Sequence, residues 1–161
     1  MATFYSNLYK QNPIRSSLYE PISAAPEHAG VLYGARFRIV VPVGTTTGDI
    51  GKIMDIGIAQ SALVPQDSGM FVYDFTYTTS ANAGGSPTIN LGFATAGQTM
   101  FGSAVTTLQS AATTTITDAV LAAAAPVITY DTLQMVFAAG TTTTLCTITG
   151  QIIYGFQAPT I

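Results

Sequence analysis

The sequence predicts an all-β fold, an antiparallel sandwich or barrel of about eight strands. Apolar and polar residues alternate along most of the chain after residue 30, the period-two pattern of half-buried strands. Clusters of Gly, Pro, Ser and Asn interrupt this pattern at intervals of about 10 to 15 residues, as turns do. Almost no segment has helical character. Ala122–Ala125 favours a helix by propensity, but Pro126 limits any helix there to a short turn.

Residues 1–30 differ from the rest and are predicted to form an extended N-terminal arm, with the sandwich domain over 31–161. Pro13, Pro21 and Pro26 break any long helix in this segment. Tyrosine supplies a large contact area with a polar tip, which suits an interface. We therefore expect the arm to become ordered on a neighbouring protein, and a floppy tail is the alternative. The partner-binding residues predicted in the arm are Tyr5, Tyr9, Lys10, Arg15 and Tyr19.

The first strand of the sandwich is predicted over 31–43. Its apolar face contains Ala35, Phe37, Ile39, Val41 and Val43. Arg36 and Arg38 point to the opposite face, and we expect them to belong to the partner-binding surface. A turn over 44–48 and a second strand over 50–58 follow. In the second strand Ile50, Lys52, Met54 and Ile56 alternate with Ile53, Asp55 and Gly57.

The clearest alternation predicts a strand over 70–79. Phe71, Tyr73, Phe75 and Tyr77 share one face, which we expect to pack inside the domain. A flexible loop over 80–87 then leads to a strand over 88–95. Gly92 inside that strand indicates a bulge or a close approach of another backbone.

The rest of the chain predicts a turn over 97–102, a weak strand over 104–108 and a threonine-rich strand within 113–121. Two long strands, over 127–137 and 141–156, complete the domain. The break at Ala138–Gly140 predicts that these two strands pair as a hairpin.

Charge is scarce throughout the chain. Charged residues make up 8% of the sequence, against roughly 25% in an ordinary soluble domain, and no Lys or Arg follows Lys52. Since charged side chains keep a free surface hydrated, this composition predicts association with other proteins. Residues 1–52 contain five basic and three acidic residues, a net +2, and residues 53–161 carry −5. The basic excess is too small for a nucleic-acid-binding protein.

Targeting and membrane signals are not evident in the sequence. The N-terminus lacks the basic and apolar regions of a signal peptide, so we expect synthesis in a reducing cytoplasm. Thr, Gly and Pro interrupt every uncharged stretch before it reaches the roughly 20 apolar residues of a membrane helix, so no membrane partner is expected.

Catalytic chemistry is not indicated either. One histidine, His28, and one cysteine, Cys146, cannot supply the three or four ligands of a zinc site. Phosphate-loop and nucleophile-elbow motifs are absent, and the spacing of the aspartates pairs none of them. We expect Asp118 and Asp131 to cap turns or lie in solvent, and Cys146 to be a small buried apolar residue. The sequence therefore predicts no enzyme, no cofactor and no bound metal, and a calcium loop at Asp49 or Asp67 is a weaker alternative.

Short β motifs in this chain resemble those of the β-sandwich decoration, or cement, proteins of tailed-bacteriophage capsids. The resembling segments are Val41–Thr46, Ile53–Ile58, Phe71–Phe75 and Pro87–Ala94. The resemblance covers about two thirds of the chain and implies a jelly-roll-like sandwich without catalytic residues. It also implies a homotrimer on the virion surface that binds the major capsid protein and bridges capsomers.

Other functions remain open at this stage. The 30-residue aromatic segment is a departure from a minimal decoration domain, and it leaves room for another minor head protein or a fibre base. A carbohydrate-binding or adhesin-like module on a virion or cell surface is the principal alternative, because exposed tyrosines could bind a glycan.

Overall fold

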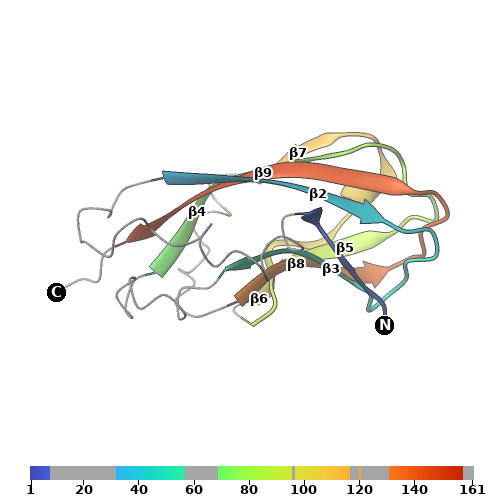
Figure 1. Cartoon of the computed structure of the whole chain (residues 1–161). Helices are drawn as coiled ribbons and strands as arrows, with labels where there is room; N and C mark the ends of the chain where they lie inside the picture. Colours follow the sequence, from blue (N-terminus) through green and yellow to red (C-terminus); the bar gives the residue numbers. More distant parts are fainter. Residues whose placement is uncertain (8–31, 57–68, 96, 117–119, 121–130, 158–161) are drawn as a thin grey trace.

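The computed structural model describes residues 1–7, 32–56, 69–95, 97–116, 120 and 131–157. In this part of the chain, nine strands form two sheets that face each other (Figure 1). The five-stranded sheet has the order β1-β3-β8-β5-β6, and the four-stranded sheet has the order β2-β9-β4-β7. Their bounds are β1 Thr3–Tyr5, β2 Leu32–Val41, β3 Ile50–Ile56, β4 Gly69–Thr79, β5 Thr88–Phe93, β6 Gly97–Val105, β7 Thr113–Thr115, β8 Asp131–Ala139 and β9 Cys146–Gln157. The predicted all-β sandwich is confirmed.

The topology is that of a jelly roll with one added strand. Strands β2 to β9, numbered one to eight, give the sheet orders 1-8-3-6 and 2-7-4-5, so the chain passes repeatedly from one sheet to the other. Among the described strands, β5 and β6 are the sequence neighbours that pair directly. β1 adds to the edge of the five-stranded sheet beside β3, and it runs parallel to β3.

Alternation along β2 and β5 builds much of the core. Phe37, Ile39 and Val41 are buried, as predicted, while Val43 lies beyond the end of the strand and is 59% exposed. A Cβ on Gly92 in β5 would lie 2.1 Å from the carbonyl oxygen of Gly97, which confirms the predicted close backbone approach. Cys146 is buried, also as predicted.

Bulges alter the predicted faces of β3 and β4. The pairing of β4 with β9 shifts between Val72 and Asp74, so Tyr73 is 53% exposed whereas Phe75 is fully buried. The prediction that these two rings share one buried face is therefore wrong. The pairing of β3 with β8 shifts in the same way between Lys52 and Met54. As a result the neighbouring residues Ile53 and Met54 are both fully buried, which strict alternation does not allow.

Two predicted connections are also wrong. The last two strands do not form a hairpin: β8 belongs to the five-stranded sheet and β9 to the four-stranded sheet. Gly140 between them has φ +76° and takes the chain across the sandwich instead. The predicted turn over 97–102 is part of β6, whose backbone at Gly97 and Gln98 comes close to Gly92 of β5. The weak strand predicted over 104–108 ends in a 3-10 turn, Thr107–Gln109.

The N-terminal residues belong to the sandwich rather than to an arm outside it. Ile50 donates a hydrogen bond to the carbonyl oxygen of Ala2 (2.9 Å), and the Phe4 ring packs edge-on against Phe137 at 6.0 Å. Gly51 makes room for this ring, because a Cβ there would lie 2.7 Å from it. The arm prediction therefore fails for Thr3–Tyr5. Residues 8–30 of the predicted arm lie outside the described residues.

Asp49 holds the start of this N-terminal segment. Its buried carboxylate accepts hydrogen bonds from the backbone N–H groups of Ala2 and of Thr46 (2.9 Å to Thr46). These two bonds, foremost the one from Ala2, hold the pKa of Asp49 below its usual value, against the opposing effect of burial.

Protonation of Asp49 is expected to weaken this attachment. A carboxylate with a lowered folded-state pKa stabilises the fold above its unfolded pKa, and that contribution is lost as the pH falls through the folded pKa. Asp49→Asn should therefore unfold at a lower temperature than wild type at neutral pH, and the difference should shrink below about pH 4. Thermal unfolding of both proteins from pH 7 to pH 2.5 tests this. A difference that stays constant over the whole range would contradict the assigned role of the charge.

Candidate partner-binding surface

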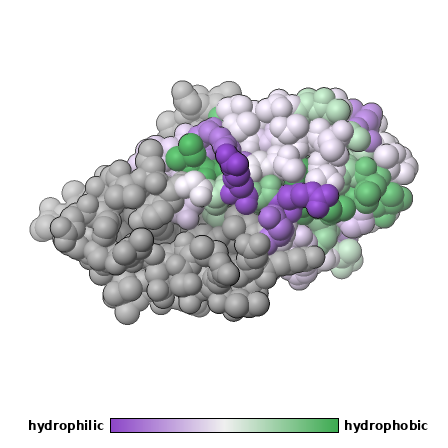
Figure 2. Space-filling model, turned by 45° about the horizontal axis from the view of Figure 1, so that its top comes forward, coloured by the Kyte–Doolittle hydropathy of each residue, from purple (hydrophilic) through white to green (hydrophobic). Residues whose placement is uncertain are grey.

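The outward side of the four-stranded sheet is a continuous threonine-rich surface, called here the sheet face. Side chains that point inward alternate with those of the sheet face on each strand, apart from the bulge at Tyr73 in β4. The sheet face consists of Arg36, Arg38 and Val40 on β2, Thr147, Thr149 and Gln151 on β9, Asp74, Thr76 and Thr78 on β4, and Thr113 and Thr115 on β7. Figure 2 shows a broad, weakly polar area on this side of the molecule, crossed by a few strongly hydrophilic side chains.

Cross-strand pairs order this surface into two rows. Arg38, Thr149, Thr78 and Thr113 stand opposite one another along the first row. The second row contains Arg36, Gln151, Thr76 and Thr115. Hydroxyl groups join neighbouring strands within each row, at 2.8 Å between Thr78 and Thr113 and 3.2 Å between Thr76 and Thr115. These bonds fix the threonine side chains, so their methyl groups present a preformed surface to a partner.

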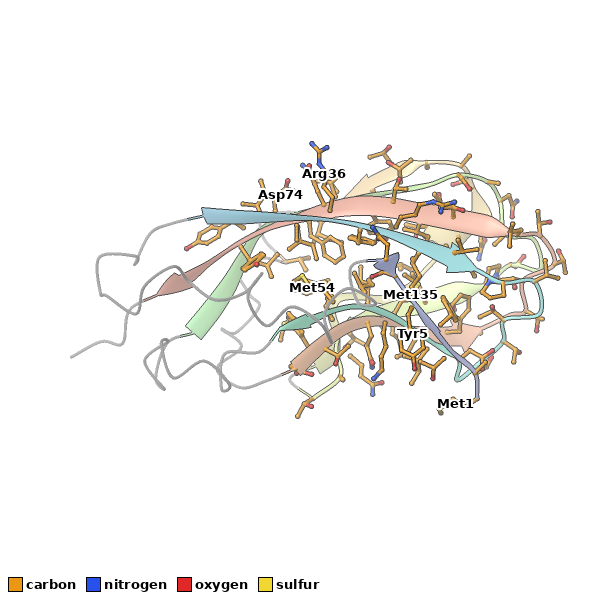
Figure 3. The ribbon with its side chains drawn as sticks, in the orientation of Figure 1. Met1, Tyr5, Arg36, Met54, Asp74 and Met135 are labelled. Atoms are coloured by element: carbon orange, nitrogen blue, oxygen red, sulfur yellow. The ribbon has the colours of Figure 1, made fainter. Side chains whose placement is uncertain are left out.

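Arg36 and Arg38 provide the positive charge at one edge of the sheet face. Both side chains are exposed, and Arg36 points away from the sandwich (Figure 3). Among the described residues, neither guanidinium has an ion-pair partner. Phe37 and Ile39, which alternate with the arginines, are buried and hold β2 in this orientation. An exposed guanidinium is a group that binds carboxylates through paired hydrogen bonds.

The other predicted binding residues divide into one that is described and four that are not. Tyr5 is 40% exposed on β1 and stands beside Lys52 of β3, so it lies on the other sheet from the arginines. Asn7, two residues after Tyr5, accepts a hydrogen bond from the backbone N–H of Arg38 (2.5 Å), which ties this segment to β2. Tyr9, Lys10, Arg15 and Tyr19 lie outside the described residues. The structure thus brings Arg36 and Arg38 together, with Tyr5 near the same edge of the sandwich.

Two exposed residues escaped the sequence prediction. Val43 and Tyr73 are predicted in the core, but a strand end exposes Val43 and a bulge exposes Tyr73. Leu145, 58% exposed just before β9, alternates with the buried Cys146, as the sequence predicts. Alternation alone therefore misses Val43 and Tyr73.

Asp131 has a structural role rather than a place in a metal site. Asp131 is buried, so it is not the solvated residue that one of the two expectations describes. It fits the other expectation, a turn cap, because its carboxylate accepts the N–H of Thr95 at 3.0 and 3.1 Å. Asp118 lies outside the described residues. Within the described ranges, no group of three or more His, Cys, Asp or Glu residues could hold a metal ion.

Among the described residues, neither a helix nor the void between the sheets indicates a further site. In the part of the chain that the structure describes, no helix is long and apolar enough to cross a membrane. A void of about 10 Å³ between the sheets is lined by apolar side chains, among them Phe37, Phe75 and Met135. It is at the lower limit of the space that a water molecule needs and offers no polar partner for one.

Comparison with solved structures finds two similar chains. The first, from a structure described as the capsid of Ralstonia phage GP4, has a TM-score of 0.62 and 16% sequence identity, and the match covers 99% of this chain and 100% of that one. The second, from the capsid asymmetric unit of cyanophage Pam1, has a TM-score of 0.55 and 16% identity, with 80% of this chain and 86% of that chain covered. No family model matches the sequence, and no curated protein matches it. The two structural matches establish a shared fold.

Proposed function

We propose that this protein is a structural component of a phage virion, a decoration protein that binds the outside of the head and bridges neighbouring capsomers. The observation that supports this most directly is the end-to-end likeness to a chain of the Ralstonia phage GP4 capsid, which leaves 1% of this chain outside the match. A second phage capsid, that of cyanophage Pam1, contains a chain of the same fold. The short β motifs that resemble cement proteins point the same way.

The surface chemistry supports a role in assembly. The sheet face has few charges, with two arginines and one aspartate among its side chains, and four of its six threonines are held by hydrogen bonds between side chains. A surface with few charges loses little hydration when a partner covers it, and fixed side chains lose little entropy. We propose that the sheet face contacts the major capsid protein, with Arg36 and Arg38 opposite acidic residues.

Stabilisation of the head would follow from burial across capsomer boundaries. A copy that contacts two capsomers must be detached before these capsomers separate, so the energy of its contacts is added to the cost of rupture. A stable contact needs roughly 1,000 Å² of buried surface. A homotrimer would bind through three such contacts, and attachment at one site raises the effective concentration at the others. This mechanism needs no catalysis.

Charge reversal on β2 tests the capsid contact. Arg36→Glu with Arg38→Glu should lower affinity for heads that lack this protein by roughly tenfold or more, because two favourable charge contacts become repulsive. Occupancy is measured by adding purified protein back to such heads and quantifying the bound copies. Arg36→Lys with Arg38→Lys is the matched control, since it keeps both charges and should retain most of the binding.

Two outcomes would count against this function. Unchanged occupancy of the double glutamate variant would remove the arginines from the contact. If wild-type protein binds no heads and is absent from purified virions by mass spectrometry, the proposed role itself is wrong.

A further inference from the structure

One end of the sandwich is formed by four connections that converge from distant parts of the sequence. They are residues 42–49 between β2 and β3, 80–87 between β4 and β5, 106–112 between β6 and β7, and 140–145 between β8 and β9. We call this surface the loop end. It lies at the right of the view in Figure 1, where β2 ends and β9 begins. The structure describes every residue of these four connections.

Hydrogen bonds tie the four connections into one rigid unit. Gly44 donates to the carbonyl oxygen of Thr142 at 2.8 Å, and Thr142 donates to that of Thr45 at 2.9 Å, which joins the first connection to the last. The carbonyl oxygen of Ala83 accepts from both Thr143 and Thr144 at 2.9 Å, and the N–H of Ala83 donates to Leu108 at 2.8 Å. These bonds join the remaining two connections. A surface that is already ordered loses little entropy when it binds.

The loop end combines this rigidity with a lack of exposed charged side chains, and the charge beside it is the N-terminal amino group, which lies close to Asp49. Asp49 is the one charged side chain in its four connections, and that carboxylate is buried and held by backbone N–H groups. Val43 and Leu145 are 59% and 58% exposed, and Val40 beside them is 36% exposed. Figure 2 shows hydrophobic side chains gathered at this end of the molecule. Thr, Ser, Gly and Ala supply most of the remaining surface.

We propose that the loop end is the surface through which copies of this chain contact one another around a rotation axis. Side chains close to such an axis face their own copies, so any charge there meets a like charge. An apolar end without exposed charged side chains avoids most of that repulsion, whereas the sheet face would bring Arg36 and Arg38 against the same residues of a second copy. The proposal rests on the self-association within the proposed function, but it does not depend on attachment to a capsid.

Charge introduced at the loop end should separate the copies. Val43→Asp with Leu145→Asp is expected to weaken self-association by tenfold or more, because every copy would bring two carboxylates to the contact. Sedimentation velocity of the free full-length protein between 1 and 100 µM measures this. Thr78→Asp with Thr149→Asp places the same charge on the sheet face and should leave self-association unchanged. Both positions of each pair are exposed, and unfolding temperatures close to wild type would show that all variants are folded.

Crosslinking gives a second test, in which the expected result is the appearance of a product rather than the loss of self-association. Val43→Cys should be joined to a second copy by a short bismaleimide, whereas Thr149→Cys should not; Cys146 is fully buried in both. A monomeric wild-type protein at 100 µM, or unchanged association of the Val43→Asp, Leu145→Asp variant, would overturn the proposal. The proposal would also be overturned if, on assembled particles, Val43→Cys were crosslinked only to a different protein. If the copies associate as expected but do not bind heads, the proposed function fails while this inference stands.

Discussion

Phe75→Ala is expected to lower the free energy of unfolding by about 3–5 kcal/mol, the usual cost of removing a fully buried phenylalanine ring. Phe75 has no exposed surface and lies at the centre of an aromatic cluster. Its ring centroid is 6.1 Å from Phe37, 5.7 Å from Tyr77 and 5.6 Å from Phe101. Truncation would remove all three contacts and would extend the small apolar void beside the ring. Urea unfolding followed by circular dichroism measures the loss.

Tyr73→Ala is the matched control for Phe75→Ala, because it removes an aromatic ring from the same strand. Tyr73 is 53% exposed, so its loss should change the free energy of unfolding by less than about 0.5 kcal/mol. Equal losses for the two variants would mean that both rings are buried. In that case β4 would follow simple alternation, and the shift in pairing between Val72 and Asp74 would be wrong.

Alternation predicts strands well because it follows directly from the pleat of the backbone. It places Phe37 and Ile39 inside and Arg36 and Arg38 outside on β2, and the structure confirms all four. It fails at bulges, since one extra residue reverses the faces for the rest of a strand. Nothing in the amino acids around Tyr73 distinguishes a bulge from regular strand.

Strand partners are harder to predict than strands. Gly140 lies between two strands in a pattern typical of a hairpin, yet the chain crosses to the opposite sheet there. The close packing of this glycine against residues 85–87 depends on a connection more than fifty positions earlier in the chain. The sequence around Gly140 does not show which distant connection packs against it.

The two candidate surfaces also differ in whether local sequence predicts them. Arg36 and Arg38 belong to one strand, so their common exposure follows from local sequence. The loop end depends on four segments that meet only when the topology is known. The scarcity of charge is visible in the sequence, where no Lys or Arg follows Lys52, but it concerns the whole chain and not these four segments in particular. Only the folded topology shows that four of these charge-poor segments meet at the loop end.

Gly85→Ala is expected to lower the free energy of unfolding by about 3 kcal/mol and to weaken self-association through the loop end. Gly85 has φ +64°, where a Cβ costs roughly 1–2 kcal/mol. In addition, the new Cβ would lie 1.8 Å from the carbonyl oxygen of Thr141, so the backbone must shift, at a further cost of about 1–3 kcal/mol. Urea unfolding and sedimentation velocity measure the two effects.

Substitutions at two other glycines separate the cost of the positive φ from the cost of the steric contact in Gly85→Ala. Gly44 has φ +85° and no atom within 4 Å of a built Cβ, so Gly44→Ala should show the backbone cost alone, about 1–2 kcal/mol. Gly34 on β2 has neither a positive φ nor a neighbour within 4 Å, and Gly34→Ala should change stability by less than about 0.5 kcal/mol. If Gly85→Ala costs no more than Gly44→Ala, the connections over 80–87 and 140–145 are not closely packed. The loop end would then lack the rigidity that favours it as a contact between copies, because its ordering would have to be supplied by binding.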